Sequence, residues 1–274
     1  MSESAEQEKA ASAHGAADAA RGAVVVLGAT SPIGEHVCRL AAEEGRPVAV
    51  ASRRLEDVEA IASDIGVRFP GSQVRAYAFD ALEMDAHRAF FEDVEADLGS
   101  IERVVVMFGD IGVHEQSIEE WSAARRVLDV NFTGAASASE AAVPALLRWA
   151  AAHPDGRPRP ALVGVASVAG DRGRQSNYLY GAAKGGYALY LQGLRNRLFG
   201  EGVHVVTMKY GFIDTPMTDG LETAIPLASP GSAARAAMRA ADRGRNVVYF
   251  PWFWRGIMAV IRGIPELVFK RLSL

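Results

Sequence analysis

The sequence predicts an α/β protein built on one doubly wound parallel sheet of about seven strands. Short apolar runs alternate with longer helical patterns along most of the chain, which is typical of parallel strands joined by crossover helices. The first apolar run, residues 24–27, leads into a glycine-containing turn, and a helical pattern follows that turn. At 274 residues, the chain is long enough for a single large domain with a sizeable core.

The expected elements follow one another in regular order. We expect strands near residues 23–28, 47–52, 73–79, 103–108, 161–166, 203–209 and 246–250. We expect helices near residues 33–45, 54–68, 84–98, 118–152, 176–200 and 230–243. Right-handed crossovers place a ligand at the carboxyl ends of such strands, where the strand order reverses.

The regions outside the expected domain, residues 22–250, differ from it in composition. Residues 1–21 are rich in Ala, Ser, Glu and Gly and hold no large apolar residue after Met1, which predicts a disordered tail. This tail has no apolar stretch typical of a signal peptide or a membrane span. Residues 251–274 form a third region, which is apolar and basic.

Charge and cysteine content exclude several classes of protein. The formal net charge of −4 argues against a nucleic-acid partner. The single cysteine, Cys38, excludes a disulfide framework and favours a reducing cytoplasmic setting, with Cys38 as a buried packing residue. No cysteine and histidine cluster has metal-ligand spacing, so we expect no metal site.

The turn after the first strand has the context of a dinucleotide-binding loop. In a strand–turn–helix unit, glycines let the backbone approach a pyrophosphate, and the helix N-terminus faces that anion. An ordinary tight turn is the alternative interpretation. The unit indicates a Rossmann arrangement, and we expect cofactor contacts from Gly28, Thr30, Ser31, Ile33 and Gly34.

Tyr180 and Lys184 form the second informative pattern. Four residues apart on a helix, the two side chains lie on one face. A lysine cation there would stabilise a tyrosinate and lower the phenol's pKa from about 10. Such a phenol can give a proton to a carbonyl oxygen or take one from an alcohol. This spacing alone is common on helix surfaces, so its weight depends on the other motifs.

Together, the motifs and their order resemble the short-chain dehydrogenase/reductase family over roughly residues 22–250. The family's four active-site residues are matched in order by Asn131, Ser167, Tyr180 and Lys184. The resemblance implies that these four residues are a catalytic tetrad. A looser resemblance, carried by residues 170–174 and the C-terminal segment, is to the branch that contains decaprenylphosphoryl-2-keto-ribose reductase.

The chain departs from the family pattern at four places. Leu27 stands where the family has a threonine, and Pro32 replaces the middle glycine of the first turn. The family's Asn-Asn-Ala-Gly turn is replaced by Phe108-Gly109-Asp110, and its Pro-Gly by Tyr210-Gly211. The last two changes lie close to the expected nicotinamide position, and none removes a catalytic group.

The resemblance also implies a role for each member of the tetrad. Ser167 holds the substrate oxygen near Tyr180, which is the general acid in reduction and the base in oxidation. Lys184 lowers the pKa of Tyr180 and binds the nicotinamide ribose, while Asn131 holds a water that relays protons to Lys184. Hydride passes directly between the nicotinamide and the substrate carbon. Tyr178 has no lysine four residues later, so we expect it in the pocket wall or the core.

The end of the second expected strand favours NADP(H) over NAD(H). An NAD-dependent enzyme usually has an acidic residue there, whereas this chain has Ser52, Arg53 and Arg54, which suit a 2′-phosphate. Alternatively, one or both arginines coat the next helix. Asp80 matches the family's adenine-binding acid, although it could instead cap a helix before Leu82.

The remaining cofactor contacts are carried over from the family. We expect Thr215 at the nicotinamide carboxamide, and we expect Gly109, Gly211 and Ile213 along the same part of the cofactor. Residues 214–229 have the length and position of a substrate lid.

The segment 251–274 begins with aromatic residues and is then apolar and basic. Arg255 and Arg262 interrupt it, so we do not expect it to span a membrane. Two interpretations stay open: peripheral contact with a membrane, or packing over the lid or in an oligomer.

These observations predict an NADP(H)-dependent enzyme that interconverts a ketone and a secondary alcohol on a small substrate, a lipid-like one or a lipid-linked glycan. The alternatives are a 3-oxoacyl or steroid-type reductase, and a non-catalytic dinucleotide-binding scaffold. We expect a homodimer or homotetramer in the cytoplasm, with membrane association an open alternative.

Overall fold

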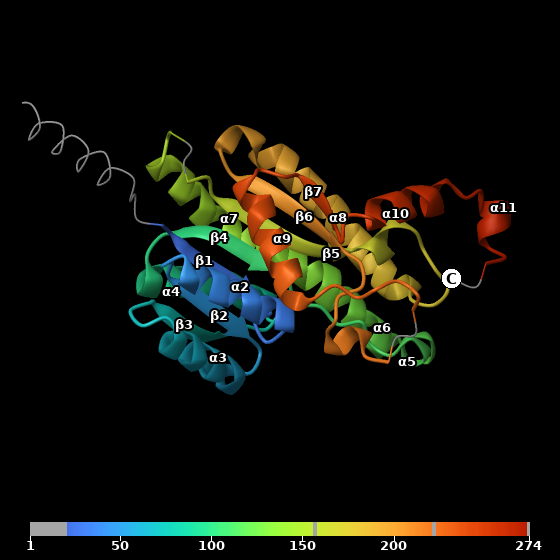
Figure 1. The fold of residues 1–274 in the computed structure, drawn as a ribbon, viewed down its shortest axis with the longest axis horizontal. Coiled ribbons are helices and arrows are strands. Elements are labelled where there is room, and N and C mark those ends of the chain that lie inside the picture. Colours follow the sequence, from blue (N-terminus) through green and yellow to red (C-terminus); the bar gives the residue numbers. More distant parts are fainter. Residues whose placement is uncertain (1–20, 156–157, 221–222, 273–274) are drawn as a thin grey trace, which may run out of the picture.

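The computed structural model describes residues 21–155, 158–220 and 223–272. Almost all of the tail expected at residues 1–21 therefore lies outside the described residues. One parallel sheet has the strand order β3-β2-β1-β4-β5-β6-β7 (Figure 1). Its strands are β1 (Ala23–Leu27), β2 (Val48–Ser52), β3 (Val74–Ala78), β4 (Ile101–Val106), β5 (Ala161–Ser167), β6 (His204–Tyr210) and β7 (Val247–Phe250). The predicted doubly wound fold and its seven strands are confirmed.

Helices cover both faces of this sheet. One layer contains α2 (Pro32–Glu43), α3 (Leu55–Arg68) and α9 (Pro230–Asp242). The opposite layer contains α4 (His87–Leu98), α7 (Ala135–Ala152) and α8 (Tyr178–Leu198). Cys38 is buried on α2, as expected of a packing residue, and burial raises the pKa of its thiol.

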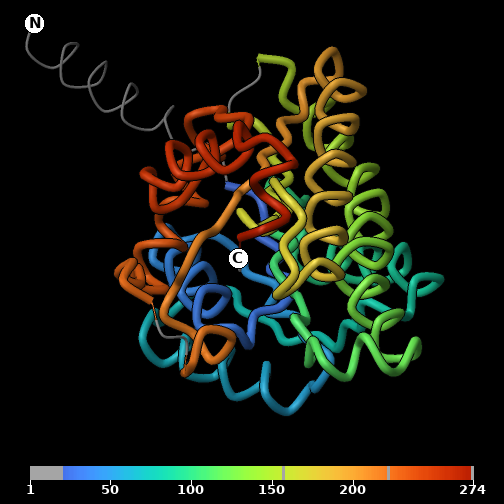
Figure 2. The backbone as a smooth tube through the Cα atoms, turned by 90° about the vertical axis from the view of Figure 1, so that its right-hand side faces the viewer, coloured from blue at the N-terminus to red at the C-terminus, as the bar shows by residue number. Residues whose placement is uncertain are grey.

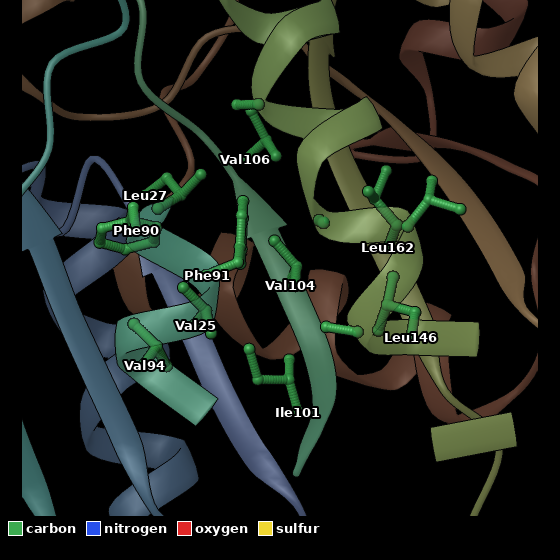
Figure 3. Close-up of a cluster of buried hydrophobic side chains, with 14 of the residues drawn as sticks. Val25, Leu27, Phe90, Phe91, Val94, Ile101, Val104, Val106, Leu146 and Leu162 are labelled. Atoms are coloured by element: carbon green, nitrogen blue, oxygen red, sulfur yellow. The ribbon is translucent and has the colours of Figure 1, made fainter. Parts of the chain in front are cut away.

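The apolar runs of the sequence arise because the central strands are buried on both sides. Along β1, Val24 and Val26 belong to the core beneath α2, whereas Val25 and Leu27 belong to the core beneath α4 and α7. Figure 3 shows the second core, where Phe90 and other side chains of α4 lie beside β1 and β4. Burial of each large apolar side chain contributes roughly 1.5–3 kcal/mol relative to exposure.

The single helix expected over 118–152 was wrong. The structure has α5 (His114–Glu119), α6 (Trp121–Leu128), a π-helical turn η2 (Asp129–Gly134) and α7. Glu120 separates α5 from α6 because its backbone is extended, with φ −117° and ψ 108°. The wider turn η2 then carries Asn131 into the interior. The helix expected over 84–98 also begins differently, as a short 3₁₀ helix, η1 (Met84–Ala86), before α4.

The strand order creates a switch point between β1 and β4, at the carboxyl ends of these two strands. After β3 the chain crosses to the other side of β1, so the connections from β1 and β4 leave in opposite directions at their carboxyl ends. Two short helices follow strands at this end of the sheet, η3 (Val168–Asp171) after β5 and η5 (Pro216–Thr218) after β6.

The C-terminal segment lies at the same end of the sheet. It forms α10 (Trp254–Gly263) and α11 (Glu266–Phe269), which follow the carboxyl end of β7. Both helices project beyond the sheet in Figure 1, and Figure 2 views the molecule from their side. Among the described residues, no helix has the length and hydropathy needed to cross a membrane.

Candidate active site

A cavity of about 490 Å³ lies over the carboxyl ends of β1, β4, β5 and β6. Most residues that the sequence assigned to the site line its wall. They are Gly28, Thr30, Ser31, Ile33, Ser52, Arg53, Asp80, Gly109, Ser167, Tyr180, Lys184, Gly211, Ile213 and Thr215. Gly34, Arg54 and Asn131 were assigned to the site but do not line the cavity, and each has a different explanation.

The first turn needs its glycines for close packing. Gly28 has φ +93°, and a Cβ there would lie 2.7 Å from the backbone nitrogen of Phe108. Gly34 lies behind the turn, where a Cβ would approach the carbonyl oxygen of Gly28 to 2.6 Å. Ser31 caps α2 by accepting a hydrogen bond from the Gly34 amide at 3.0 Å. Pro32 suits this helix start because the first residue needs no amide donor.

The two arginines after β2 have different surroundings. Arg53 lines the cavity, next to Ser52, whose hydroxyl lies 3.2 Å from that of Thr30. Arg54 points elsewhere: its guanidinium pairs with Asp57 at 2.5 Å, and its side chain is 79% exposed. The interpretation that an arginine coats the next helix therefore describes Arg54, while Arg53 is available to a ligand in the cavity.

Asp80 caps the turn after β3 and also lines the cavity. Its Oδ1 accepts a hydrogen bond from the Leu82 amide at 2.9 Å, which caps the turn after β3. The same residue lines the cavity. Its backbone carbonyl also lies 3.0 Å from Nε2 of His87 at the start of α4, which fixes the position of the turn.

Ser167 and Tyr180 come together from the end of β5 and the first turn of α8. The Ser167 hydroxyl accepts a hydrogen bond from the Ala169 amide at 3.1 Å and donates one to the Tyr210 carbonyl at 3.4 Å. Burial raises the pKa of Tyr180 to about 12, and the nearby Ser167 hydroxyl opposes part of that rise. The phenol therefore keeps its proton at neutral pH.

Lys184 lies one helical turn after Tyr180, on the same side of α8. Its Nζ donates a hydrogen bond to the Val165 carbonyl at 3.1 Å and lies 6.0 Å from the centre of the Tyr180 ring. Burial lowers the pKa of Lys184 to about 8. The expectation that Lys184 brings the pKa of Tyr180 below 10 was wrong for this structure, because burial is the largest effect on the phenol and raises its pKa.

Asn131 lies behind the cavity and holds the turn after β4. Its side chain is fully buried, and Nδ2 donates to the carbonyls of Val127 at 2.8 Å and Asp110 at 2.5 Å. Its Oδ1 accepts from the Asp110 amide at 3.2 Å. A Cβ on Gly109 would lie 2.9 Å from this oxygen and 3.3 Å from Nζ of Lys184. The glycine that survives in the altered turn is therefore required by close packing.

Several residues of the cavity wall were not predicted from the sequence. Arg126 of α6 lines the cavity and pairs with Asp110 at 3.0 Å, and Phe79, Phe108 and Met217 add apolar surface. Phe108 and Phe79 each follow a strand end, which is a usable signal. Arg126 comes from a helix whose start was predicted wrongly, so no local pattern indicated it.

The segment 214–229 closes on itself beside the cavity. The Asp214 amide donates to the Ala228 carbonyl at 2.9 Å, so the two ends of the segment lie together. Thr218 donates a hydrogen bond to the Thr215 carbonyl at 2.9 Å, and both residues line the cavity. Residues 221–222 of the expected lid lie outside the described residues.

The C-terminal segment packs on the loop that follows Ser167. Arg172 donates to the Ile264 carbonyl at 2.9 Å and pairs with Glu266 at 2.8 Å. Its guanidinium carbon also lies 4.1 Å from the centre of the Phe269 ring. Trp254 is buried against Val168 and Phe212, whose ring centre lies 4.9 Å from that of the indole.

Comparison with known proteins identifies similar sequences and folds. A family model described as short chain dehydrogenase matches residues 22–225. An uncharacterized oxidoreductase of Streptomyces coelicolor is 33% identical over 250 residues, covering 91% of this chain and 95% of its own. One from Mycobacterium tuberculosis is also 33% identical over 250 residues, covering 91% and 96%. The structure of an alcohol dehydrogenase from the archaeon Thermococcus sibiricus, complexed with 5-hydroxy-NADP, is similar with a TM-score of 0.71 and 19% identity, covering 84% of this chain and 96% of that one.

Proposed function

Because the chain belongs to the short-chain dehydrogenase family, we propose that this oxidoreductase uses NADP(H) to interconvert a ketone and a secondary alcohol. Family membership makes it an NAD(P)-dependent dehydrogenase or reductase. The proposed ketone–alcohol reaction rests on one observation. Ser167, Tyr180 and Lys184 converge on one cavity, and the glycine turn forms another part of its wall.

The residues present fit a nicotinamide dinucleotide. The close approaches at Gly28 and Gly109 leave backbone rather than side chain at two places along the cavity wall. The turn from Gly28 to Ile33 and the N-terminus of α2 would hold the pyrophosphate. Asp80 would bind the adenine end, Lys184 the nicotinamide ribose, and residues 211–215 the carboxamide.

The end of β2 supports NADP(H) as the preferred cofactor. Arg53 lines the cavity beside Ser52, and no acidic residue stands among residues 51–54. A guanidinium suits the doubly charged 2′-phosphate, whereas a carboxylate would repel it. NAD(H), which lacks that phosphate, would leave Arg53 without a matching anion.

The chain's own residues supply orientation and proton transfer. The bound nicotinamide supplies the hydride in reduction and accepts it in oxidation. Ser167 donates a hydrogen bond to the substrate oxygen and holds it beside the Tyr180 phenol. With its pKa near 12, Tyr180 is protonated at neutral pH, so it can give its proton to the oxygen as the carbonyl becomes an alcohol. Lys184 provides the nearby positive charge that stabilises the tyrosinate left behind.

The substrate side of the cavity favours a bulky, apolar ketone. Met217 contributes apolar wall, and Arg126, which pairs with Asp110, lines the same cavity. We therefore propose a substrate with a large apolar part, such as a lipid-linked keto sugar. The 3-oxoacyl and steroid-type ketones are the competing substrates for the same cavity.

The experiment combines cofactor binding with turnover. NADPH fluorescence should change on binding, and NADPH oxidation should be measured with small ketones, long-chain ketones, 3-oxoacyl thioesters and ketosteroids. We expect binding in every case and faster turnover with the larger substrates. Binding without turnover on any ketone would favour a scaffold, and the absence of NADPH binding would refute the proposal.

We also propose that the protein is a homodimer or homotetramer. Apolar side chains are exposed along and after α8, with Leu189 at 69% and Phe199 at 87% exposure. Their burial against a second copy would supply part of the association energy. Light scattering on the full-length protein would give the mass, and a monomer at high concentration would contradict this proposal.

A further inference from the structure

The C-terminal segment buries one set of apolar side chains and exposes another. Trp254, Met258 and Phe269 are buried against the body of the protein. Five of the 19 large apolar side chains that are exposed among the described residues lie in residues 251–272. We call these five the outer apolar surface, and they are Trp252, Val260, Leu267, Val268 and Leu272.

This surface and the cavity both lie at the carboxyl ends of the strands. The helices α10 and α11 follow the carboxyl end of β7, while the cavity lies over the carboxyl ends of its neighbours (Figure 1). Exposed Ile111 and Val113 follow β4, and exposed Met217 follows β6, at the same end of the sheet. Exposed apolar side chains therefore occur at the end of the sheet where both the C-terminal segment and the cavity lie.

The charge of the segment is opposite to that of the chain. Residues 251–274 hold four basic side chains and one acidic side chain, whereas the whole chain has a formal charge of −4. Arg172 neutralises the acidic one, Glu266. In the part of the chain that the structure describes, Arg255, Lys270 and Arg271 are exposed and have no ion-pair partner.

We propose that the outer apolar surface, with Arg255, Lys270 and Arg271, docks on an anionic lipid bilayer. Tryptophan favours the boundary between headgroups and acyl chains, and the basic side chains are attracted to anionic headgroups. A second copy of the chain fits this surface less well, because a two-fold contact would bring the same unpaired positive charges together. The protein would lie on the bilayer, with its cavity mouth near the lipid.

Co-sedimentation of the full-length protein with vesicles tests this proposal without depending on catalysis. Vesicles of phosphatidylcholine with about 30% phosphatidylglycerol are compared with pure phosphatidylcholine vesicles. We expect the protein to sediment with the anionic vesicles at low salt and to be released at about 0.5 M salt, where surface charges are screened. Pure phosphatidylcholine should retain much less protein.

Two variants locate the contact, and each has a matched control. Lys270→Glu with Arg271→Glu should weaken binding at least about tenfold, because both attractions become repulsions. The control Arg243→Glu with Arg245→Glu reverses the same number of positive charges just before β7, at the amino ends of the strands. This control should bind the vesicles normally. Trp252→Glu should also weaken binding, whereas Val67→Glu should not, although Val67 is 78% exposed and Trp252 82%.

The proposal is overturned if the wild type stays in the supernatant with anionic vesicles, or if the control variants lose binding as strongly as the test variants. If Trp252→Glu instead breaks an oligomer in light scattering and leaves vesicle binding unchanged, the surface is a contact between copies. Circular dichroism and NADPH binding should be unchanged in all four variants, because none of these residues lines the cavity. A loss of catalysis alone would refute the proposed function and leave docking intact.

Discussion

The indole of Trp254 fills the space beside Gly211 that any side chain on that residue would need. Gly211 follows β6 and lines the cavity, whereas Trp254 begins α10. The same indole is buried against Val168, the neighbour of Ser167. The C-terminal segment therefore packs against the cavity wall at Gly211 and next to Ser167, although it is remote from Ser167 in the sequence.

Gly211→Ala should destabilise the protein by about 1–3 kcal/mol, because the new methyl group overlaps the Trp254 indole. The displaced wall should also raise the KM for NADPH. Gly256→Ala is the control: a Cβ there meets no atom within 4 Å, and alanine in a helix interior stabilises by roughly 0.5–1 kcal/mol over glycine. Urea denaturation measures both values, and equal stabilities for the two variants would contradict the overlap.

Tyr180→Phe should reduce turnover roughly 10²- to 10⁴-fold while leaving NADPH binding nearly unchanged. The change removes the transferable proton and very little volume, and the ring stays packed beside Ala169. Tyr178→Phe removes a similar phenol that is exposed and does not line the cavity, so its activity should stay near that of the wild type. Turnover of Tyr180→Phe within about threefold of the wild type would exclude Tyr180 as the acid.

Arg53→Ala should weaken NADPH binding roughly tenfold to hundredfold and barely change NADH binding, because only NADPH carries the 2′-phosphate. Arg54→Ala provides a neighbouring control, since Arg54 pairs with Asp57 outside the cavity. Fluorescence titration with both cofactors measures the effect. Equal losses for NADPH and NADH, or a larger loss in Arg54→Ala, would show that Arg53 does not bind the phosphate.

The fold could be predicted because its signals are local. Central strands buried on both faces must be apolar along their whole length, so β1 and β4 were visible as continuous runs. The pairing of Tyr180 with Lys184 depends only on the helix period. The position of Gly28 depends only on the strand before it and the helix after it.

The parts that were missed depend on contacts between distant residues. The extended backbone of Glu120 and the π-helical turn at Asn131 break a stretch whose composition favours one long helix. The pKa of Tyr180 depends on how completely the surrounding elements exclude water, which no spacing reveals. The contact of Trp254 with Gly211 joins residues of two different elements, and neither has a local signal for it.

Lys184→Met should abolish turnover and yet stabilise the protein at neutral pH. Burial lowers the pKa of Lys184 to about 8, whereas an unperturbed lysine has a pKa of 10.5. Below pH 8 the folded protein therefore holds a charge in a site that disfavours it, which costs about 3 kcal/mol. Methionine has nearly the same length and removes this charge, although it also removes a hydrogen bond to the Val165 carbonyl worth about 1 kcal/mol.

The pH dependence separates this cause from a general improvement in packing. Between pH 8 and 10.5 the unfolded wild type binds more protons at Lys184 than the folded one, so the wild type gains stability as the pH rises. The Met variant lacks this titration. Its advantage, expected at about 1–3 kcal/mol at pH 7, should therefore shrink as the pH approaches 10. Urea denaturation at pH 7, 8.5 and 10 measures the difference, and an advantage that does not change with pH would show that Lys184 is not desolvated as the structure describes.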